Sequence, residues 1–174
     1  MLAPSRIWWK PLGRLEKSWL LVAFIWCVFL TAMMPIWYFF GKQNVPTETY
    51  RTTPAEYDAK VKAFVTQYQI GEQNGVPIVA APPGSDVYLR AMRYNWYPII
   101  QLEKGETYRL HISSLDVQHG FSLQPVNINL QVIPGYDFVA TIVPTSSGNF
   151  TIVCNEFCTL GHHTMSGKMI VTEK

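Results

Sequence analysis

The longest apolar run of the chain spans Ser18 to Phe40 and contains no acidic or basic side chain. As a helix, its roughly 22 apolar positions would rise about 33 Å, enough to cross the hydrocarbon core of a bilayer. A cleavable signal peptide has a shorter apolar centre and a cleavage site of small residues, and neither is present here. The pattern therefore predicts one membrane-spanning helix at residues 18–40.

Basic residues predict the orientation of this helix. Lys42 alone stands just beyond the run, whereas four basic residues precede it: Arg6, Lys10, Arg14 and Lys17. Cytoplasmic flanks of membrane helices carry the excess of lysine and arginine. We therefore expect a single-pass protein with residues 1–17 in the cytoplasm and residues 41–174 on the outer side of the membrane.

A short amphipathic helix is predicted just after the anchor. Thr53-Pro-Ala-Glu56 has the sequence of a capping box with proline at the first helical position. Apolar residues then recur at helical spacing and form one face: Tyr57, Val61, Phe64, Val65 and Tyr68. Residues 41–53 are polar and are predicted to be a tether. The segment 41–80 would thus join the anchor to a C-terminal domain.

From Gly75 onward, short β-like runs alternate with turn residues. The predicted strands are 87–93, 107–113, 127–133, 137–143, 149–154 and 167–173. Some are separated by turn dipeptides, such as Lys104-Gly105 and Pro134-Gly135. Regularly spaced short strands are typical of an all-β sandwich or barrel. The pattern therefore predicts a mainly β domain at residues 81–174.

Composition narrows the functions that need to be considered. The chain has 174 residues, enough for about one domain plus an accessory segment. Its net charge is only +2, so nucleic acid is not an implied partner. There is no phosphate-binding glycine loop and no Ser/His/Asp pattern. Of three cysteines, Cys27 lies in the apolar run and is interpreted as an inert packed thiol.

The candidate chemistry is concentrated in VCNEFCTLGHHTM, residues 153–165. Cys154, Cys158, His162 and Met165 follow one another as C-x3-C-x3-H-x2-M. A disulfide would account for the cysteines alone. A blue copper site uses one thiolate, two imidazoles and a weak axial methionine, so two thiolates exceed its needs. They can instead bridge two copper ions, each of which then requires one imidazole and one weak ligand.

A binuclear site requires a second histidine from elsewhere in the chain. His111 is in register with Thr107 and Arg109, which predicts that it lies on the polar, solvated face of a strand. His119 stands in SLDVQHGFSL, which we interpret as a polar loop that can display a ligand. His119 is therefore the best candidate. His163 would give H-x-M spacing and is interpreted as a neighbouring or surface residue.

These motifs resemble a known family. DVQHGF at 116–121 together with CNEFCTLGHHTM at 154–165 is similar to the binuclear CuA site of cytochrome c oxidase subunit II. The similarity extends through NINLQVIPG at 127–135 and GKMIV at 167–171. LEKSW at 15–19 looks like the start of the single membrane helix in B-family (ba-type) enzymes. The resemblance implies a cupredoxin-like Greek-key β-sandwich or barrel with one N-terminal transmembrane helix.

The resemblance also implies a ligand set. By similarity, Cys154 and Cys158 bridge both coppers, and His119 and His162 each supply one imidazole. The two weak ligands would be the thioether of Met165 and the backbone carbonyl of Glu156. In many A-family members this glutamate side chain also reaches a magnesium ion, so the resemblance leaves magnesium open at Glu156.

The implied function is electron input to a terminal cytochrome c oxidase, a proton-translocating oxidoreductase. The copper centre would accept electrons one at a time from a c-type cytochrome and pass them to haem in subunit I, where O2 is reduced to water. Subunit I, a small further subunit and the cytochrome are the implied partners. The expected location is a bacterial or archaeal cell (inner) membrane, with the C-terminal domain on the periplasmic or outer side.

Three further residues receive interpretations from the resemblance. Tyr94 and Trp96, in RYNWYP at 93–98, stand where the family places an aromatic patch for electron input, and core packing is the alternative. Glu16 matches a glutamate at the mouth of a proton-uptake path in B-family relatives. A hydrated interfacial carboxylate is the alternative for Glu16.

Other functions were weighed against the oxidase. A membrane-tethered copper-binding or delivery cupredoxin without an oxidase partner stays open, but it would not need NINLQVIPG or LEKSW. Subunits of quinol oxidases keep the fold and have lost the copper ligands, which are all present here. Nitrous-oxide reductase carries the same type of copper site on a much longer chain.

Overall fold

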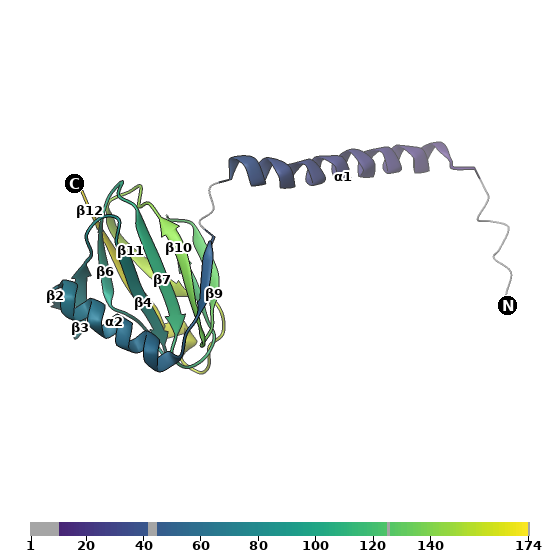
Figure 1. The fold of residues 1–174 in the computed structure, drawn as a ribbon. Coiled ribbons are helices and arrows are strands. Elements are labelled where there is room, and N and C mark those ends of the chain that lie inside the picture. Colours follow the sequence, from purple (N-terminus) through teal and green to yellow (C-terminus); the bar gives the residue numbers. More distant parts are fainter. Residues whose placement is uncertain (1–10, 42–44, 125, 174) are drawn as a thin grey trace. The chain divides into compact units, whose positions relative to one another are not determined.

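A computed structural model describes residues 11–41, 45–124 and 126–173. The chain divides between residues 42 and 43 into two compact units. The first contains one long helix, and the second contains all of the described strands together with a shorter helix (Figure 1).

The long helix α1 spans Arg14–Phe40 and has no buried residue within its unit. Its length and apolar composition allow it to cross a membrane, as predicted. The helix begins four residues before the apolar run, and the carboxylate of Glu16 accepts a hydrogen bond from the Gly13 N–H at 2.7 Å. Arg6, Lys10 and Lys42, on which the predicted orientation rests, lie outside the described residues.

The shorter helix α2 spans Pro54–Tyr68, and its predicted capping box is confirmed. The Glu56 N–H donates to the Thr53 hydroxyl at 3.2 Å, and the Thr53 N–H donates to the Glu56 carboxylate at 2.9 Å. Four residues of the predicted apolar face are buried: Tyr57, Val61, Phe64 and Val65. This face packs against β3, β4 and β7, so α2 belongs to the body of the domain.

Short strands make up most of the C-terminal unit. Within the described residues they are β1 (Glu48–Arg51), β2 (Gln69–Gln73), β3 (Val76–Ala80), β4 (Asp86–Met92), β5 (Asn95–Tyr97), β6 (Ile99–Glu103), β7 (Tyr108–Ser114), β8 (His119–Leu123), β9 (Ile128–Val132), β10 (Tyr136–Ile142), β11 (Gly148–Cys154) and β12 (Ser166–Thr172). The predicted mainly β class is therefore confirmed.

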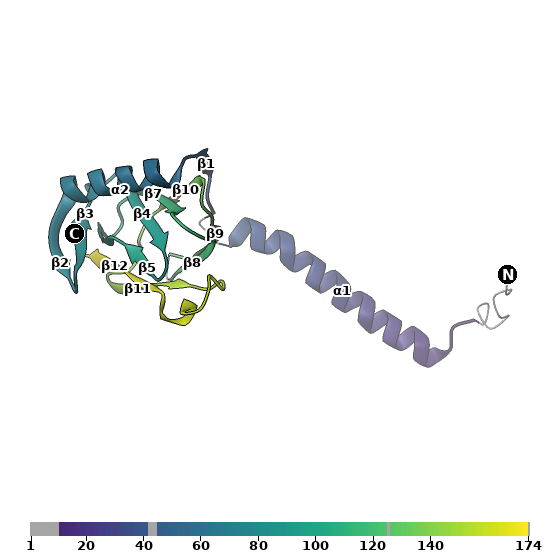
Figure 2. The ribbon, with the colours of Figure 1, turned by 90° about the horizontal axis from the view of Figure 1, so that it is seen from below.

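The strands form one strongly curled sheet. Its main path runs β1-β10-β7-β4-β5-β12-β11-β8-β9, and β2, β3 and β6 join it beside β12. In strands such as β4, alternate residues point into the curl, as Val87, Leu89 and Ala91 do, and they contribute to one apolar core. Figure 2 shows α2 and the yellow loop that follows β11 on opposite sides of this domain.

The six predicted strands are all present, with ends that differ by at most one residue. Residues 41–53, predicted as a polar tether, contain β1, which pairs with β10 through Glu48 to Arg51. Strands β2, β3, β5, β6 and β8 were also not predicted. Each is only three to five residues long. A run of that length shows too few alternations to stand out in sequence.

The prediction that His111 is solvated was wrong. His111 is only 5% exposed, and its Nδ1 atom lies 2.9 Å from the Asp137 carboxylate. The ring of Tyr88 stacks over the imidazole at a centroid distance of 4.5 Å. The alternation correctly placed His111 on the outer face of β7. That face is covered by α2 and Tyr88 instead of by water.

Candidate metal centre

Three neighbouring strands bring the predicted ligands to one edge of the sheet. His119 begins β8, Cys154 ends β11, and Met165 directly precedes β12. Strand β11 runs antiparallel to both β8 and β12. The end of one antiparallel strand lies beside the starts of its neighbours, so the ligand-bearing positions converge. The loop 155–161 and the 3-10 turn η2 (His162–Thr164) complete this edge.

The sulfur of Cys154 contacts two of the predicted donors. It lies 3.9 Å from Nδ1 of His119 and 3.3 Å from the backbone carbonyl oxygen of Glu156. The ligand atoms of His119, Cys154 and Cys158 all lie within 4.8 Å of one another. This spacing is that of a cluster able to share a metal.

The sulfur of Cys158 contacts the remaining two donors. It lies 3.7 Å from Nδ1 of His162 and 3.9 Å from Sδ of Met165. Backbone hydrogen bonds fix these positions, because the Met165 N–H donates to the His162 carbonyl at 3.0 Å and the Cys154 N–H donates to the Met165 carbonyl at 3.3 Å. The H-x2-M spacing is thus one turn of η2 that aims both side chains at the same thiol.

The cysteines are unbonded to each other and both are buried. Burial, and then the neighbouring thiol of Cys154, raise the pKa of the Cys158 thiol to about 11. Two thiolates this close and this dry are unfavourable without a compensating positive charge. The two sulfurs are therefore better suited to binding a shared cation than to existing as two free thiolates.

His119 is held from behind by Asp116. The residue is fully buried at the start of β8, so its predicted place in a polar loop was wrong. Pairing with β9 and β11 turns HGFSL into a strand. Nε2 of His119 lies 2.9 Å from the carboxylate of Asp116. This contact leaves Nδ1 facing Cys154.

The charge of Asp116 decides which nitrogen of His119 carries the proton. Burial alone would raise the pKa of Asp116, but hydrogen bonds from His119 and from Arg93 outweigh it and lower the pKa to about 2. An ionised carboxylate only accepts hydrogen bonds, so the proton of the neutral imidazole sits on Nε2. Nδ1 then keeps its lone pair for a metal, in the carboxylate–histidine–metal arrangement common to such sites.

A close approach at Gly120 allows the metal loop to cross β8. A Cβ atom at this position would lie 2.2 Å from the Asn155 side-chain oxygen and 2.7 Å from the Glu156 backbone nitrogen. The Asn155 N–H donates to the Gly120 carbonyl at 3.2 Å. Glycine therefore lets the loop lie directly on the strand that carries His119, which brings the Glu156 carbonyl to the cysteines.

The side-chain carboxylate of Glu156 and its backbone carbonyl have different partners. The carbonyl oxygen lies beside Cys154 Sγ, and the carboxylate lies beside Gln118. It accepts a hydrogen bond from the Gln118 amide at 2.5 Å. His163 is exposed, while His162 beside it is half-buried. Of the four histidines, all of which the structure describes, only His119 and His162 contact the cysteines.

The two aromatic residues predicted for electron input differ in exposure. Trp96 is 2% exposed and packs edge-on against His119 and Phe121, with ring centroids 6.2 and 5.3 Å away. Tyr94 is 39% exposed, and its hydroxyl lies 3.2 Å from that of Thr159 in the metal loop. Tyr94 thus reaches the surface beside the centre, whereas Trp96 is a wall behind it.

Some residues of the site were not anticipated from sequence. Asp116 lies three positions before His119, and the D-x-x-H spacing was the available signal. Phe157 and Leu160 on the metal loop are 78% and 87% exposed, which is unusual for large apolar side chains beside a polar cluster. Their position inside the motif, between its ligands, was the signal for them.

No family model matches the chain. A cytochrome c oxidase subunit 2 of Thermus thermophilus is 33% identical over 97 residues, which cover 55% of this chain and 72% of the relative. The chain belongs to the cytochrome c oxidase subunit 2 family. Another subunit 2 from Thermus thermophilus is 27% identical over 167 residues, covering 94% of this chain and 95% of the relative.

Solved structures confirm the fold of this chain. A chain of a heme–copper terminal oxidase dimer, determined by cryo-EM, superposes with a TM-score of 0.57 at 22% identity, covering 91% of this chain and 100% of the other. A rusticyanin structure gives a TM-score of 0.50 at 16% identity, covering 74% and 99%. The predicted cupredoxin-like fold is therefore confirmed.

Family membership makes the chain a subunit of a haem–copper oxidase, an oxidoreductase complex. The helix α1, which is long and apolar enough to cross a membrane, fits a membrane-anchored topology. The cluster of His119, Cys154 and Cys158 fits a copper site of the CuA type. A copper-delivery protein without an oxidase partner is not favoured by these relatives.

Proposed function

We propose that this chain is the electron-input subunit of a cytochrome c oxidase and that it holds a binuclear copper A centre. One observation carries the proposal: the other donor atoms each lie 3.3 to 3.9 Å from one of two buried, unbonded cysteine sulfurs. Two sulfurs at the middle of the donor set, with the imidazoles and weak donors around them, suit thiolates that bridge two metals. The ligands are His119, Cys154, Glu156 through its carbonyl, Cys158, His162 and Met165.

The donor set fits copper in kind as well as in place. Thiolate and thioether are soft ligands, and imidazole suits copper, whereas zinc sites rarely use methionine. Two coppers held by Cys154 and Cys158 would spread the change of one electron over both metals, which would lower the reorganisation on transfer. The chain contributes rigidity, because its ligands sit at strand ends and on one turn of η2.

The second task of the chain is to keep the centre dry and oriented. His119 is fully buried between Trp96 and Asp116, and Cys154, Cys158 and Met165 are each at most 4% exposed. Such a shell excludes water and limits rearrangement of the ligands, and both effects tune a redox potential. The residues thus support transfer of an electron without any bond to a substrate.

We propose that a c-type cytochrome delivers electrons at the surface around Tyr94, Phe157 and Leu160. Tyr94 supports this because it is exposed and contacts the metal loop through Thr159. The electron would then leave to a haem of subunit I, where O2 is reduced to water with proton translocation. A small further subunit completes the proposed complex, which is most similar to the ba-type enzymes.

The topology of the proposal follows the sequence. Residues 1–17 would be cytoplasmic and residues 18–40 would cross a bacterial or archaeal cell membrane. The copper domain on the periplasmic or outer side would be the compact unit 43–174, because β1, α2, β2 and β3 of the predicted tether 41–80 pack into it. Glu156 is the proposed magnesium ligand at the contact with subunit I. Among the described residues, the hydrogen-bond partner of its carboxylate is the neutral Gln118 amide, which a magnesium ion would replace.

Copper stoichiometry tests the function directly. The full-length chain is purified in detergent, loaded with copper, and measured for copper per chain and by electron paramagnetic resonance. Two coppers that share one unpaired electron are expected. A single copper with an ordinary one-metal hyperfine pattern would overturn the binuclear centre. Purification of the native membrane complex with its haem subunit then separates an oxidase subunit from a solitary copper protein.

Replacing Asp116 by Asn should weaken the centre without destroying it. The amide keeps the shape but removes the anion that orients His119, and loss of such an outer partner typically lowers metal affinity by roughly 10- to 100-fold. Copper affinity measured by competition with a chelator, together with the absorption spectrum, gives the answer. Asp58→Asn on α2, which also removes an ion-paired carboxylate, is the matched control. Equal affinities in both variants would contradict the role of Asp116.

Replacing Tyr94 by Leu should slow oxidation of the donor cytochrome while leaving the copper spectrum unchanged. Tyr94 bridges the surface and the metal loop but donates no ligand atom, so it affects docking and electron input alone. Stopped-flow rates with the reduced cytochrome measure the effect. Tyr50→Leu is the control, because Tyr50 is exposed on β1. An unchanged rate at Tyr94 would remove it from the path.

Replacing Glu16 by Gln should lower turnover and proton pumping of the assembled oxidase if Glu16 lies at a proton-uptake mouth. Glutamine can still accept the hydrogen bond from the Gly13 N–H, so the cap of α1 is retained. Oxygen consumption and proton release in reconstituted vesicles measure the effect. Glu72→Gln on β2 is the control. Unchanged pumping would leave Glu16 with its capping role alone.

A further inference from the structure

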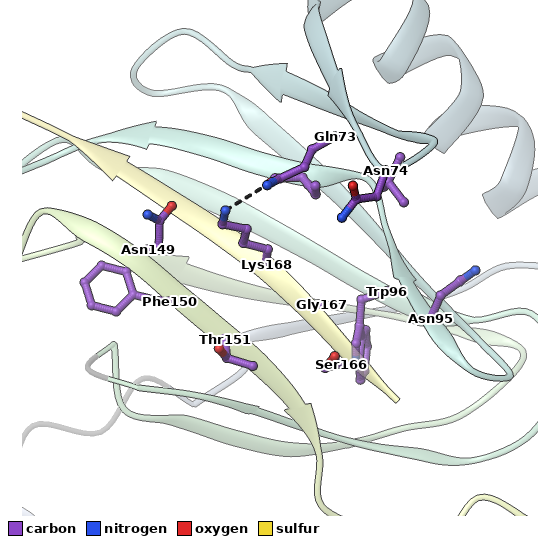
Figure 3. A pocket seen from close by; sticks show the side chains of 12 residues that line it. Gln73, Asn74, Asn95, Trp96, Asn149, Phe150, Thr151, Ser166, Gly167 and Lys168 are labelled. Atoms are coloured by element: carbon purple, nitrogen blue, oxygen red, sulfur yellow. Dashed lines mark hydrogen bonds between the residues drawn. The ribbon is translucent and has the colours of Figure 1, made fainter. Parts of the chain in front are cut away.

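A pocket with a cavity volume of about 350 Å³ lies beside β12 (Figure 3), and none of the described residues that line it is a cysteine. On this side β12 pairs with β5 at Ser166 and with β6 only from Met169 onward. No pair of described residues bridges the interval between them, so the ladder is interrupted next to Gly167 and Lys168. Gln73 at the end of β2 and Asn74 in the turn that follows it also line the pocket.

The lining of this pocket is rich in hydrogen-bonding groups. It holds amide and hydroxyl side chains from four parts of the sheet: Gln73, Asn74, Asn95, Asn149, Thr151 and Ser166. None of the described lining residues is acidic, and Lys168 is the one that carries charge. These donors come from several sides, which suits a ligand with acceptor atoms in several directions.

Lys168 provides an uncompensated positive charge. Its ammonium group donates to the Gln73 side-chain oxygen at 3.0 Å. Among the described residues it has no carboxylate partner, whereas Lys62 and Lys104 each have one within 3.1 Å. An ammonium group has three N–H donors. A half-buried cation surrounded by neutral donors is a poor site for a metal ion and a good one for an anion.

Trp96 forms the wall between this pocket and the metal centre. It lines the pocket, and its ring packs edge-on against His119. Its indole N–H is buried without a hydrogen-bond partner among the described residues. A Cβ atom at position 167 would lie 2.5 Å from Cβ of Trp96, so Gly167 keeps this wall in place.

We propose that the pocket binds a phosphate-class oxyanion, with Lys168 as its charged partner and the surrounding amide and hydroxyl groups as further donors. Charge-assisted hydrogen bonds of this kind are the strong ones. The tetrahedral oxyanion is favoured over a planar carboxylate because the donors approach from β2–β3, β5, β11 and β12. The proposal does not depend on the copper centre. Because the chain is membrane-anchored, the phosphate can be free or belong to a phospholipid headgroup.

Calorimetric titration of the full-length chain in detergent with inorganic phosphate, at ionic strength held constant with chloride, tests the proposal. We expect saturable binding of one phosphate per chain. Lys168→Gln should weaken it by roughly tenfold or more, since it removes a charge-assisted contact. Lys60→Gln, an exposed lysine on α2, should leave it unchanged. Absence of saturable binding, or equal binding by the Lys168 variant, would overturn the site.

A second variant and a lipid comparison complete the test. Gln73→Leu removes a lining amide without changing charge and should weaken phosphate binding less than Lys168→Gln. In nanodiscs of phosphatidylcholine with phosphatidylglycerol, a headgroup in the pocket should reduce the apparent phosphate affinity relative to phosphatidylcholine alone. Equal affinity in both nanodiscs supports free phosphate as the ligand. A Gln73 variant weaker than the Lys168 variant would count against the assigned charge partner.

Discussion

His162→Asn should abolish the two-copper spectrum, whereas His163→Asn should leave it intact. The two histidines are adjacent in sequence, yet only Nδ1 of His162 lies 3.7 Å from Cys158 Sγ. His163 is exposed and contacts none of the described donors. Because His162 is a proposed direct ligand, the effect of its loss should exceed the roughly 10- to 100-fold loss of affinity expected for an outer partner such as Asp116.

Electron paramagnetic resonance of the copper-loaded full chain distinguishes the two variants. In His162→Asn the unpaired electron should localise on one copper, or one copper should be lost, and copper per chain should fall below two. In His163→Asn the pattern of one electron shared by two coppers should persist. Because both variants carry the same substitution at adjacent positions, His163→Asn controls for effects of the substitution on folding and on purification. A reversed outcome, with His163 as the sensitive residue, would refute the assigned spacing.

The parts of the fold that could be predicted from sequence are those set by nearby residues. The capping box at Thr53 and Glu56 acts within one turn, and the apolar run of α1 is continuous. Longer strands such as β7 and β10 contain enough alternating apolar and polar residues to be predicted from sequence. In each case the signal and the structure that it predicts occupy the same short stretch of chain.

Elements that depend on distant partners could not be predicted in this way. Strand β8 is short, and HGFSL becomes a strand only because β9 and β11 flank it. The outer face of β7 seemed solvated because the covering helix α2 lies about forty residues earlier in the chain. His111 was therefore predicted to be solvated and His119 to stand in a polar loop, and both are buried. Alternation tells the side of a strand but not what covers that side.

The residues of the candidate site also differ in whether nearby sequence was enough to predict them. Cys154, Cys158, His162 and Met165 could be grouped from spacing because a single loop carries them. His119 required an argument from chemistry, namely that two thiolates call for a second imidazole, and the structure places His119 against Cys154. Asp116 was missed because its role depends on the direction of one ring nitrogen, which spacing does not give.

Cys158→Ser should have the largest effect on the copper centre. Cys158 Sγ contacts both His162 and Met165, so this one atom connects two further donors. A serine hydroxyl is a hard ligand that stays protonated, and it cannot bridge two coppers as a thiolate does. We expect copper to fall from two to at most one per chain. Cytochrome oxidation by the assembled complex should fall to the background of the assay.

Cys27→Ser supplies the matched control, because Cys27 is the remaining cysteine of the chain and lies on α1. It should keep the copper count, the spectrum and the oxidation rate of the unaltered protein. Copper retention in Cys158→Ser with the shared-electron pattern still present would show that Cys158 is no bridge. If instead one copper remained with a one-metal pattern, the remaining donors would be Cys154 and the imidazoles. The second thiolate would then be what makes this cupredoxin fold a two-copper site.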